Sequence, residues 1–315
     1  MRKRRAVIVG SEGQDGTLMH QYLLVKKYDL FLINRNNFDI SDKNEISKLM
    51  KSYKPHEVFF FAALHKSSQD TASNFSEEIV DSININSFSP IFFLEAILQF
   101  SLSTRFFYAS STLIFSASEN LINEASTPDP SDSYGISKLV TMQAIKSYRE
   151  KGVFASCGIL SNHESKYRNI KFLSKKIVTK AVDAYFGDTQ KLVIGDMSSY
   201  VDWSYAPDFI DLIHDILLQE APGDFILASG EIKQVKDFIK VAFNEVGLDY
   251  NDYIEEDKSI IKRSNGTRKF DISKVQELLN WKPRHSFDEM VKKLVNDEIR
   301  VRKSRAGVSW TKLVI

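Results

Sequence analysis

The sequence contains a single cysteine and no hydrophobic run that approaches the ~18 residues of a membrane-spanning helix. Cys157 therefore cannot form an internal disulfide, which indicates a reducing, cytoplasmic setting. An excess of one charge is also missing, because 42 Lys and Arg residues balance 41 Asp and Glu residues. A chain with a net charge of +1 has no global field that attracts nucleic acid or an anionic membrane. We expect neither as a partner, and we predict no metal site.

What the sequence does contain is an alternation of strand-like and helix-like segments. With 315 residues, of which 43% are hydrophobic, the chain can bury one large core or two lobes. The predicted strands span residues 6–9, 28–33, 57–63 and 104–110, and the predicted helices span residues 17–26, 43–53 and 77–100. This alternation is typical of parallel strands with helices on both faces of the sheet. It predicts an α/β fold with a doubly wound parallel sheet.

Three glycines follow the first predicted strand directly, at positions 10, 13 and 16. In a dinucleotide-binding turn the first glycine permits the tight turn, the second lets the backbone approach the pyrophosphate, and the third lets the next helix pack closely on the sheet. The phosphates then lie at the helix N-terminus. The motif predicts a Rossmann domain over residues 1–160. After about Gly158 the pattern becomes less regular, so we expect a smaller C-terminal α/β substrate lobe, mainly over residues 161–315, from which some segments return to the Rossmann domain.

The end of the second predicted strand carries the sequence Asn34-Arg35-Asn36-Asn37, where a dinucleotide fold often has an acid for the adenosine ribose. The next acidic residue, Asp39, comes too late to occupy that place. Arg35 could pair with a 2′-phosphate, whereas the asparagines could hydrogen-bond a free ribose. The sequence is therefore compatible with either NAD or NADP.

Tyr134 and Lys138 lie four residues apart, so they project from one face of a predicted helix. An ammonium at this spacing can favour the phenolate and let the tyrosine act as a general base. The spacing alone is not specific, because Tyr-Lys pairs beginning at positions 22 and 167 share it. Tyr134 differs from them by beginning a helix after the strand that ends near Ser111. The carboxyl ends of the strands line the ligand crevice of a doubly wound sheet, so we expect Tyr134 and Ser111 to meet at the cofactor.

These features together resemble the extended short-chain dehydrogenase/reductase family, and the resemblance runs nearly end to end. Within the family the chain is most similar to the GDP-mannose 4,6-dehydratase branch, on the segments Gly13-Gln14-Asp15-Gly16, 158–165 and Asp202-Trp203. Further family features are Asp39-Ile40-Ser41-Asp42, Ala62-Ala63 and the closing Leu278-Leu279-Asn280-Trp281-Lys282-Pro283. The resemblance implies an NAD(P)-dependent enzyme that acts on a GDP-activated sugar.

The resemblance also implies a role for each residue of the site. Tyr134 would remove the proton of the sugar 4-hydroxyl as hydride passes to the nicotinamide, with Ser111 bonded to that hydroxyl. Lys138 would hold the ribose and lower the tyrosine pKa. The implied substrate-binding residues are Ser111, Asn162, Lys175, Lys176 and Arg263, although the two lysines could equally be solvated surface residues. The implied cofactor-binding residues are Gly10, Gly13, Gln14, Asp15, Gly16, Asn34, Arg35, Asp39, Ile40, Ala62, Ala63, Ser110, Tyr134 and Lys138.

The chain departs from this branch at Leu113. In the related dehydratases a glutamate two residues after the catalytic hydroxyl removes the C5 proton and helps to expel the C6 hydroxyl, and a leucine carries no proton. Losing one positioned acid/base typically costs ~10²- to 10⁴-fold in rate, so elimination would need a relocated group such as Glu119 or Glu124. Val201 likewise replaces the arginine before Asp-Trp. A long insertion after the second strand is also missing, which favours a dimer and NAD.

The sequence therefore predicts an oxidoreductase that works at C4 of a GDP-activated hexose or heptose, as a dehydrogenase, epimerase or reductase without dehydration. The first alternative is a GDP-mannose-type 4,6-dehydratase with a relocated acid/base. The second is a catalytically silent relative that binds nucleotide sugar or cofactor, but the complete set of Tyr134, Lys138 and Ser111 favours an enzyme. The predicted assembly is a homodimer that pairs the helices within residues 77–100 and 133–150.

Overall fold

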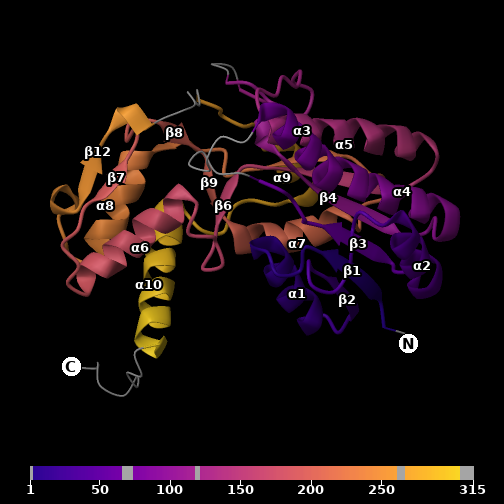
Figure 1. The fold of residues 1–315 in the computed structure, drawn as a ribbon, viewed down its shortest axis with the longest axis horizontal. Helices are drawn as coiled ribbons and strands as arrows, with labels where there is room; N and C mark the ends of the chain where they lie inside the picture. Colours follow the sequence, from indigo (N-terminus) through magenta and orange to yellow (C-terminus); the bar gives the residue numbers. More distant parts are fainter. Residues whose placement is uncertain (1–2, 66–73, 118–120, 261–266, 306–315) are drawn as a thin grey trace.

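A computed structural model describes residues 3–65, 74–117, 121–260 and 267–305. Its main element is a six-stranded parallel sheet with the order β10-β5-β4-β3-β1-β2 (Figure 1). The strands are β1 (Arg5–Val9), β2 (Asp29–Ile33), β3 (Glu57–Phe60), β4 (Arg105–Ser111), β5 (Ala155–Leu160) and β10 (Asp224–Leu227). The sheet extends from β1 to β2 on one side and to β3 on the other, so the predicted doubly wound α/β fold is confirmed.

Helices cover both faces of this sheet (Figure 1). Each face has its own hydrophobic core. One core includes side chains of α1 (Gln14–Val25), α7 (Ala206–Ile216) and α9 (Ser273–Leu279). The other includes side chains of α2 (Lys43–Tyr53), α4 (Ser89–Phe100) and α5 (Ser133–Glu150). Along β1, Ala6 and Ile8 face the first core, whereas Val7 and Val9 face the second. A strand buried on both faces reads as a continuous apolar run, which is why residues 6–9 are recognisable in the sequence.

A third hydrophobic core lies in the segment that follows β5. Its helices are α6 (Leu173–Tyr185), α8 (Val235–Glu245) and α10 (Phe287–Arg305). Three two-stranded sheets accompany them: β6 (Asn162–Glu164) with β9 (Trp203–Tyr205), β7 (Leu192–Ile194) with β12 (Ile254–Glu256), and β8 (Tyr200–Val201) with β11 (Lys233–Gln234). The predicted domain boundary at residue 160 stays a prediction. Among the described helices, none is long and apolar enough to cross a membrane.

The predicted helix over residues 77–100 is interrupted by a π-helical turn (Asn84–Phe88), which separates α3 (Phe75–Ile83) from α4. The side chain of Asn86 accepts a hydrogen bond from the Leu64 amide at 2.7 Å and donates one to the Leu64 carbonyl at 3.0 Å. The Asn86 carbonyl accepts hydrogen bonds from the Tyr108 hydroxyl at 2.7 Å and from the Thr141 hydroxyl at 2.8 Å. Tertiary hydrogen bonds to β4 and α5 thus replace the uniform helical pattern that the apolar spacing predicts.

His214 fixes α7 against the sheet and against the start of β2. Its Nε2 lies 3.0 Å from the Tyr28 hydroxyl oxygen, and the Tyr22 ring meets the imidazole edge-on at 5.5 Å. The imidazole also stacks on Phe59 of β3, with 6.5 Å between the ring centres. Burial of this side chain, which leaves His214 4% exposed, lowers its pKa to about 4, and two nearby basic side chains act in the same direction. The folded protein therefore holds His214 neutral at pH values where an exposed histidine is protonated.

We expect acid to destabilise the protein through His214. Between pH 6.5 and 4 the unfolded chain binds a proton at this histidine and the folded chain does not, so the free energy of unfolding falls as the pH falls. A pKa lowered from 6.5 to about 4 corresponds to a total loss of about 3 kcal/mol. His214→Gln, which can still accept a hydrogen bond from Tyr28, should lose about 2 kcal/mol less than the native protein between pH 6.5 and 4.5 in urea unfolding. Equal losses in the two proteins would contradict this expectation.

Candidate functional site

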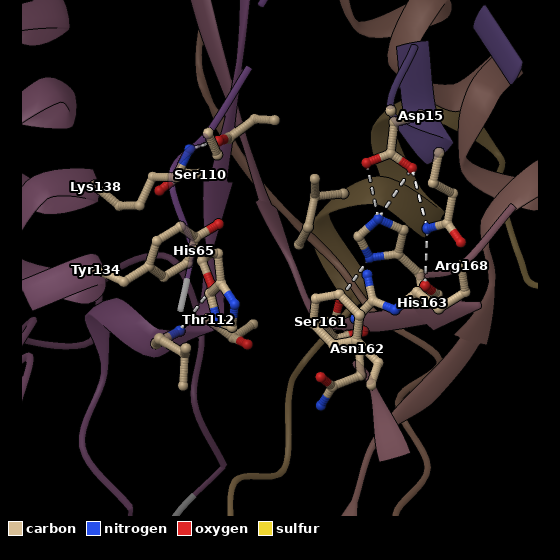
Figure 2. Close-up of a pocket in the computed structure, with 18 of the residues that line it drawn as sticks. Asp15, His65, Ser110, Thr112, Tyr134, Lys138, Ser161, Asn162, His163 and Arg168 are labelled. Carbon is tan, nitrogen blue, oxygen red and sulfur yellow. Dashed lines mark hydrogen bonds and ion pairs between the residues drawn. The ribbon is translucent and has the colours of Figure 1, made fainter. Parts of the chain in front are cut away.

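A cavity of about 550 Å³ opens where four strands of the large sheet end. Residues that follow β1 and β3, the last residues of β4 and β5, and the start of α5 all line it (Figure 2). The carboxyl ends of the strands form the ligand crevice of a doubly wound sheet at the point where the strand order reverses. This reversal lies at β1, which has β2 on one side and β3 on the other. The cavity therefore lies where the sequence predicts that Tyr134 meets the cofactor.

The glycine turn after β1 has the geometry that a pyrophosphate site requires. Gly10 has a φ of +86°, and a Cβ there would lie 2.7 Å from the Ala62 amide nitrogen. A Cβ at Gly16 would lie 2.1 Å from the Gly10 carbonyl oxygen, so α1 can approach the turn this closely only because Gly16 lacks a side chain. Gly13 lines the cavity, and α1 begins at the next residue. These residues fit NAD(P), whose phosphates the N-terminus of α1 would hold.

The predicted cofactor-binding residues fall into three groups. Those that line the cavity are Gly13, Gln14, Asp15, Ala63, Ser110, Tyr134 and Lys138. Gly10, Gly16 and Ala62 pack against one another beneath the turn. Asn34, Arg35, Asp39 and Ile40 lie at or beyond the end of β2, outside the lining of the cavity as far as the described residues define it.

The asparagines at the end of β2 use their side chains to shape the turn. Asn37 Oδ1 accepts a hydrogen bond from the Asn34 amide at 2.9 Å, and Asn34 Oδ1 accepts one from the Asn36 amide at 2.9 Å. Asp39 likewise accepts hydrogen bonds from the amide and hydroxyl of the residue two positions later. Arg35 is exposed, and its guanidinium has no partner within the described parts of the chain. The side chains of Asn34 and Asn37 thus help to hold the turn, and Arg35 is exposed on it.

The first turn of α5 rests directly on the turn that follows β4. Asp132 caps the helix, because its Oδ1 accepts a hydrogen bond from the Gly135 amide at 2.7 Å. A Cβ at Gly135 would lie 2.4 Å from the Leu113 carbonyl oxygen, so this contact requires a glycine. Tyr134, one residue earlier, is thereby held beside the end of β4 and lines the cavity.

The contact brings Tyr134, Lys138 and Ser111 together in the lining of the cavity, as predicted. Figure 2 shows Tyr134 and Lys138 there. Lys138 Nζ donates a hydrogen bond to the Ala109 carbonyl at 2.7 Å and lies 5.3 Å from the centre of the Tyr134 ring. The hydroxyl of Ser111 accepts a hydrogen bond from the Leu113 amide at 3.2 Å, which orients it at the end of β4. The wall therefore presents a phenol, an amine and a hydroxyl together, which are groups that can exchange a proton with a bound ligand.

The pKa of Tyr134 is raised in this structure, whereas the sequence predicts that it is lowered. Burial raises the pKa of Tyr134, and the positive charge of Arg168 opposes this rise only in part. Burial also lowers the pKa of Lys138 to about 7. Burial and the nearby carboxylates of Asp15 and Asp132 cause the rise in the Tyr134 pKa, and the predicted lowering by Lys138 stays a prediction. A protonated Tyr134 is suited to donate a proton to a C4 oxygen.

Leu113 lines the cavity, at the position where the resemblance implies an acid/base. Glu124, one candidate for a relocated acid, accepts a hydrogen bond from the Ile226 amide of β10 at 2.8 Å and lies outside the described lining of the cavity. Its carboxylate is thus used to hold the loop before α5 against the sheet. The other candidate, Glu119, lies outside the described residues. Glu124 does not supply the missing acid in this arrangement.

The predicted diphosphate-binding residues are only partly brought together. Asn162 lines the cavity. Lys175 instead forms an ion pair with Glu298, with 2.7 Å from Nζ to Oε2, and lines a separate cavity of about 10 Å³. Lys176 is half-buried on α6 and outside the described lining, and Arg263 lies outside the described residues. The implied role of Lys175 at the diphosphate is therefore wrong in this structure, because the side chain is held on α10.

Three basic residues that sequence reasoning missed line the cavity: Arg168, Lys171 and Arg268. The guanidinium of Arg168 lies 3.5 Å from the centre of the Phe172 ring, and Arg268 Nε donates a hydrogen bond to the Phe115 carbonyl at 2.9 Å. A signal for Arg168 and Lys171 was present, because they follow β5 closely and the ends of parallel strands face the ligand. Together the three side chains bring positive charge to the cavity, which suits an anionic diphosphate.

Asp15 and His163 tie the glycine turn to β6 (Figure 2). His163 Nε2 lies 3.0 Å from Asp15 Oδ2, and Gln14 Nε2 donates a hydrogen bond to the His163 carbonyl at 3.0 Å. Burial alone would raise the pKa of Asp15, but His163 and Arg168 lower it overall. Burial alone would lower the pKa of His163, but Asp15 raises it overall. The pair is therefore favoured in its charged form, and it joins two walls of the cavity.

Comparisons with known proteins point to one family. A family model described as GDP-mannose 4,6 dehydratase matches residues 33–294. GDP-mannose 4,6 dehydratase 1 of Arabidopsis thaliana is 29% identical over 335 residues, which cover 96% of this chain and 91% of the relative. These matches confirm the predicted family.

Solved structures confirm the fold. A dTDP-glucose 4,6-dehydratase from Bacillus anthracis in complex with NAD has a TM-score of 0.82 at 15% identity, covering 97% of this chain and 100% of that chain. RMD from Pseudomonas aeruginosa complexed with NADPH has a TM-score of 0.82 at 17% identity, covering 95% of this chain and 98% of that chain. The predicted Rossmann-type architecture is thus shared along nearly the whole chain.

Proposed function

The chain belongs to the GDP-mannose 4,6-dehydratase family, and we propose that it is an NAD(P)-dependent oxidoreductase acting at C4 of a GDP-activated hexose or heptose without dehydration. One observation carries the proposal: Leu113 stands in the cavity wall that also contains Ser111, Tyr134 and Lys138. Oxidation or reduction at C4 needs a proton donor or acceptor at O4, which this wall provides. Dehydration needs a further group that removes the C5 proton and protonates the C6 hydroxyl, and Leu113 can do neither.

The residues of the wall have separate tasks in this reaction. Nicotinamide, when bound, accepts or supplies the hydride at C4. Ser111 and Tyr134 hold the C4 oxygen, and the phenol exchanges the proton that accompanies the hydride. A buried Tyr134 with a raised pKa favours donation to a C4 ketone, so the wall suits the reduction direction at neutral pH. Lys138, with a pKa of about 7, can restore or remove the proton of the phenol near neutral pH.

The proposed cofactor is NAD, with NADP as the alternative. Relatives of known structure contain NAD or NADPH, and the glycine turn fits both. Arg35 is positioned for a 2′-phosphate, whereas the missing insertion after β2 favours NAD. The lone Cys157 is a buried free thiol, which supports a cytoplasmic location.

Two other functions fit less well. The names of the sequence relatives favour a GDP-mannose 4,6-dehydratase. A dehydratase would need a relocated acid, but the carboxylate of Glu124 accepts a hydrogen bond from the Ile226 amide of β10 instead. A catalytically silent binder would have no need of a buried lysine beside a buried tyrosine, since burying an amine without a function costs stability. The retained Tyr134 and Lys138 therefore support an enzyme.

We also propose a homodimer that pairs the outer sides of α3, α4 and α5. These helices lie against one another on one face of the sheet, and Val80, Phe88 and Val140 are 56, 46 and 38% exposed there. Val140→Glu should convert the dimer to a monomer in light scattering at micromolar concentration, because a charge would be buried in the interface. Leu218→Glu, at an exposed apolar residue beyond α7, is the matched control and should leave the dimer intact. A native protein that is monomeric would refute the pairing.

Tyr134→Phe should reduce hydride transfer to or from C4 by ~10²- to 10⁴-fold, because it removes the proton carrier at the C4 oxygen. Cofactor affinity should change little, since the glycine turn is untouched. Single-turnover absorbance of the reduced nicotinamide measures the first quantity, and fluorescence titration measures the second. A parallel loss of both would show that Tyr134 serves cofactor binding rather than proton transfer.

The leucine at position 113 predicts that the product keeps its C6 hydroxyl. Given GDP-mannose or a GDP-heptose, the native protein should oxidise C4 or exchange the hydrogen there, yet release no 6-deoxy sugar and incorporate no solvent deuterium at C6. Leu113→Glu should restore at most slow elimination, because the wall around a leucine is apolar and places a carboxylate poorly. Mass spectrometry of the products in deuterated water makes the measurement. Efficient formation of a 4-keto-6-deoxy sugar by the native protein would refute the proposed function.

A further inference from the structure

The glycine turn after β1 is joined directly to the end of β2. The amides of Gly10 and Ser11 donate hydrogen bonds to the Ile33 carbonyl at 2.9 and 3.0 Å. The Ser11 hydroxyl donates a third to the same oxygen at 3.1 Å. Ile33 is the last residue of β2, and in a dinucleotide fold a side chain near the end of this strand binds the adenosine ribose. The part of the glycine turn next to Ser11 therefore lies close to the place of that ribose.

Glu12 follows Ser11 and lines the cavity. The residue is exposed, and its carboxylate has no hydrogen bond or ion pair among the described residues. An unpaired carboxylate close to a pyrophosphate is unfavourable, because like charges repel. Its charge is offset where it accepts hydrogen bonds from another part of the same cofactor. The hydroxyls of the adenosine ribose are donors of that kind.

Two other acids near the turn already have partners. Asp15 pairs with His163, with 3.0 Å from Oδ2 to Nε2 (Figure 2). Asp39, beyond the end of β2, accepts hydrogen bonds from the Ser41 amide at 2.9 Å and from the Ser41 hydroxyl at 2.6 Å. Asp39 also lies outside the described lining of the cavity, whereas Glu12 lies within it. Of these three carboxylates, that of Glu12 is the one available to a ribose.

The turn after β2 provides no carboxylate at its start, but it carries a positive charge. Asn34 follows the strand directly, and its Oδ1 accepts a hydrogen bond from the Asn36 amide at 2.9 Å. Arg35 is exposed on the same turn and is of the type that accommodates a 2′-phosphate. Arg35 lies outside the described lining of the cavity, so Glu12 is the better placed of the two charges. The two residues oppose each other in the choice between NAD and NADP.

We propose that Glu12 determines the cofactor specificity, because its carboxylate accepts hydrogen bonds from the ribose hydroxyls of NAD and repels the 2′-phosphate of NADP. The inference rests on the proposed function, which requires a nicotinamide dinucleotide. A carboxylate accepts hydrogen bonds and donates none, so it suits two neighbouring hydroxyls. A 2′-phosphate replaces one of these donors by a group with about two negative charges at neutral pH. The glycine turn thus supplies the ribose acid that the end of β2 lacks.

The test measures cofactor binding by the purified full-length protein, after bound nucleotide has been removed and without a sugar substrate. NADH and NADPH are titrated separately at pH 7.5 and low salt, where screening is weak, and their fluorescence reports binding. The informative quantity is the ratio of the two Kd values, because the cofactors differ only at the 2′ position. The native protein should bind NADH ~10- to 10²-fold more tightly, the range expected for hydrogen bonds to a charged group.

Glu12→Gln removes the charge and keeps the size of the side chain, so it should lower this preference by ~10- to 10²-fold. Glu12 is exposed, so the substitution leaves the core untouched. Glu220→Gln is the matched control. It removes the same charge from an exposed residue beyond α7, outside the described lining of the cavity, and should keep the native ratio.

A double variant tests the opposing charge. Once Glu12→Gln has removed the repulsion, the positive charge of Arg35 should attract the 2′-phosphate. Adding Arg35→Ala should therefore weaken NADPH binding by ~10-fold relative to Glu12→Gln and leave NADH binding unchanged. NADPH binding that does not respond to Arg35→Ala would overturn the opposition between the two residues.

The outcomes separate this inference from the proposed function. Native affinities that are equal for the two cofactors, or that favour NADPH, would overturn the inference. A ratio that Glu12→Gln leaves unchanged would also overturn it. Both results would leave the C4 oxidoreductase standing, since either cofactor can exchange a hydride there. A native protein that binds neither NADH nor NADPH would overturn the proposed function and this inference with it.

Discussion

The close contact between the first turn of α5 and the turn after β4 is the constraint on which the site depends. Gly135 has no side chain, and a Cβ there would stand 2.4 Å from the Leu113 carbonyl oxygen. This approach lets Lys138, one turn further along α5, bury its amine and donate a hydrogen bond to the Ala109 carbonyl of β4. Tyr134 and Ser111 then line the same cavity. Three functional groups from two elements are thus positioned by one backbone contact, with no flexible connection between them.

The same contact explains why the side chain at position 113 can differ from that of the related dehydratases while the scaffold stays the same. The Leu113 carbonyl packs on Gly135 and its amide bonds to Ser111, so the backbone at this position is held whichever side chain it carries. A leucine makes the wall apolar at that point, while the proton-carrying groups at the C4 oxygen remain. Redox chemistry at C4 needs only the retained groups, whereas elimination needs the one that is missing.

Periodicity and glycine spacing predicted much of the fold but only part of the site. The helix at residues 43–53 and the strand ends that carry the glycine turn and Ser111 follow from local patterns, and the structure has them there. The π-helical turn at Asn84–Phe88 has no such pattern, because Asn86 is held by hydrogen bonds to distant residues. Lys175 looked like a phosphate ligand in the sequence, and only the tertiary structure places Glu298 beside it. Local spacing predicts which face a residue occupies, but not which distant charge it meets.

Asp15 couples the glycine turn, on one side of the cavity, to the segment after β5, on the other. A carboxylate in the first turn of α1 is favourable for the helix, yet it would repel the phosphates that the same helix end holds. Its ion pair with His163, together with the charge of Arg168, offsets that repulsion. Both partners come from the segment after β5, which also supplies Phe172 beneath His65. The segment after β5 therefore sets the charge of the carboxylate at the glycine turn, so the two parts of the cavity are electrostatically coupled.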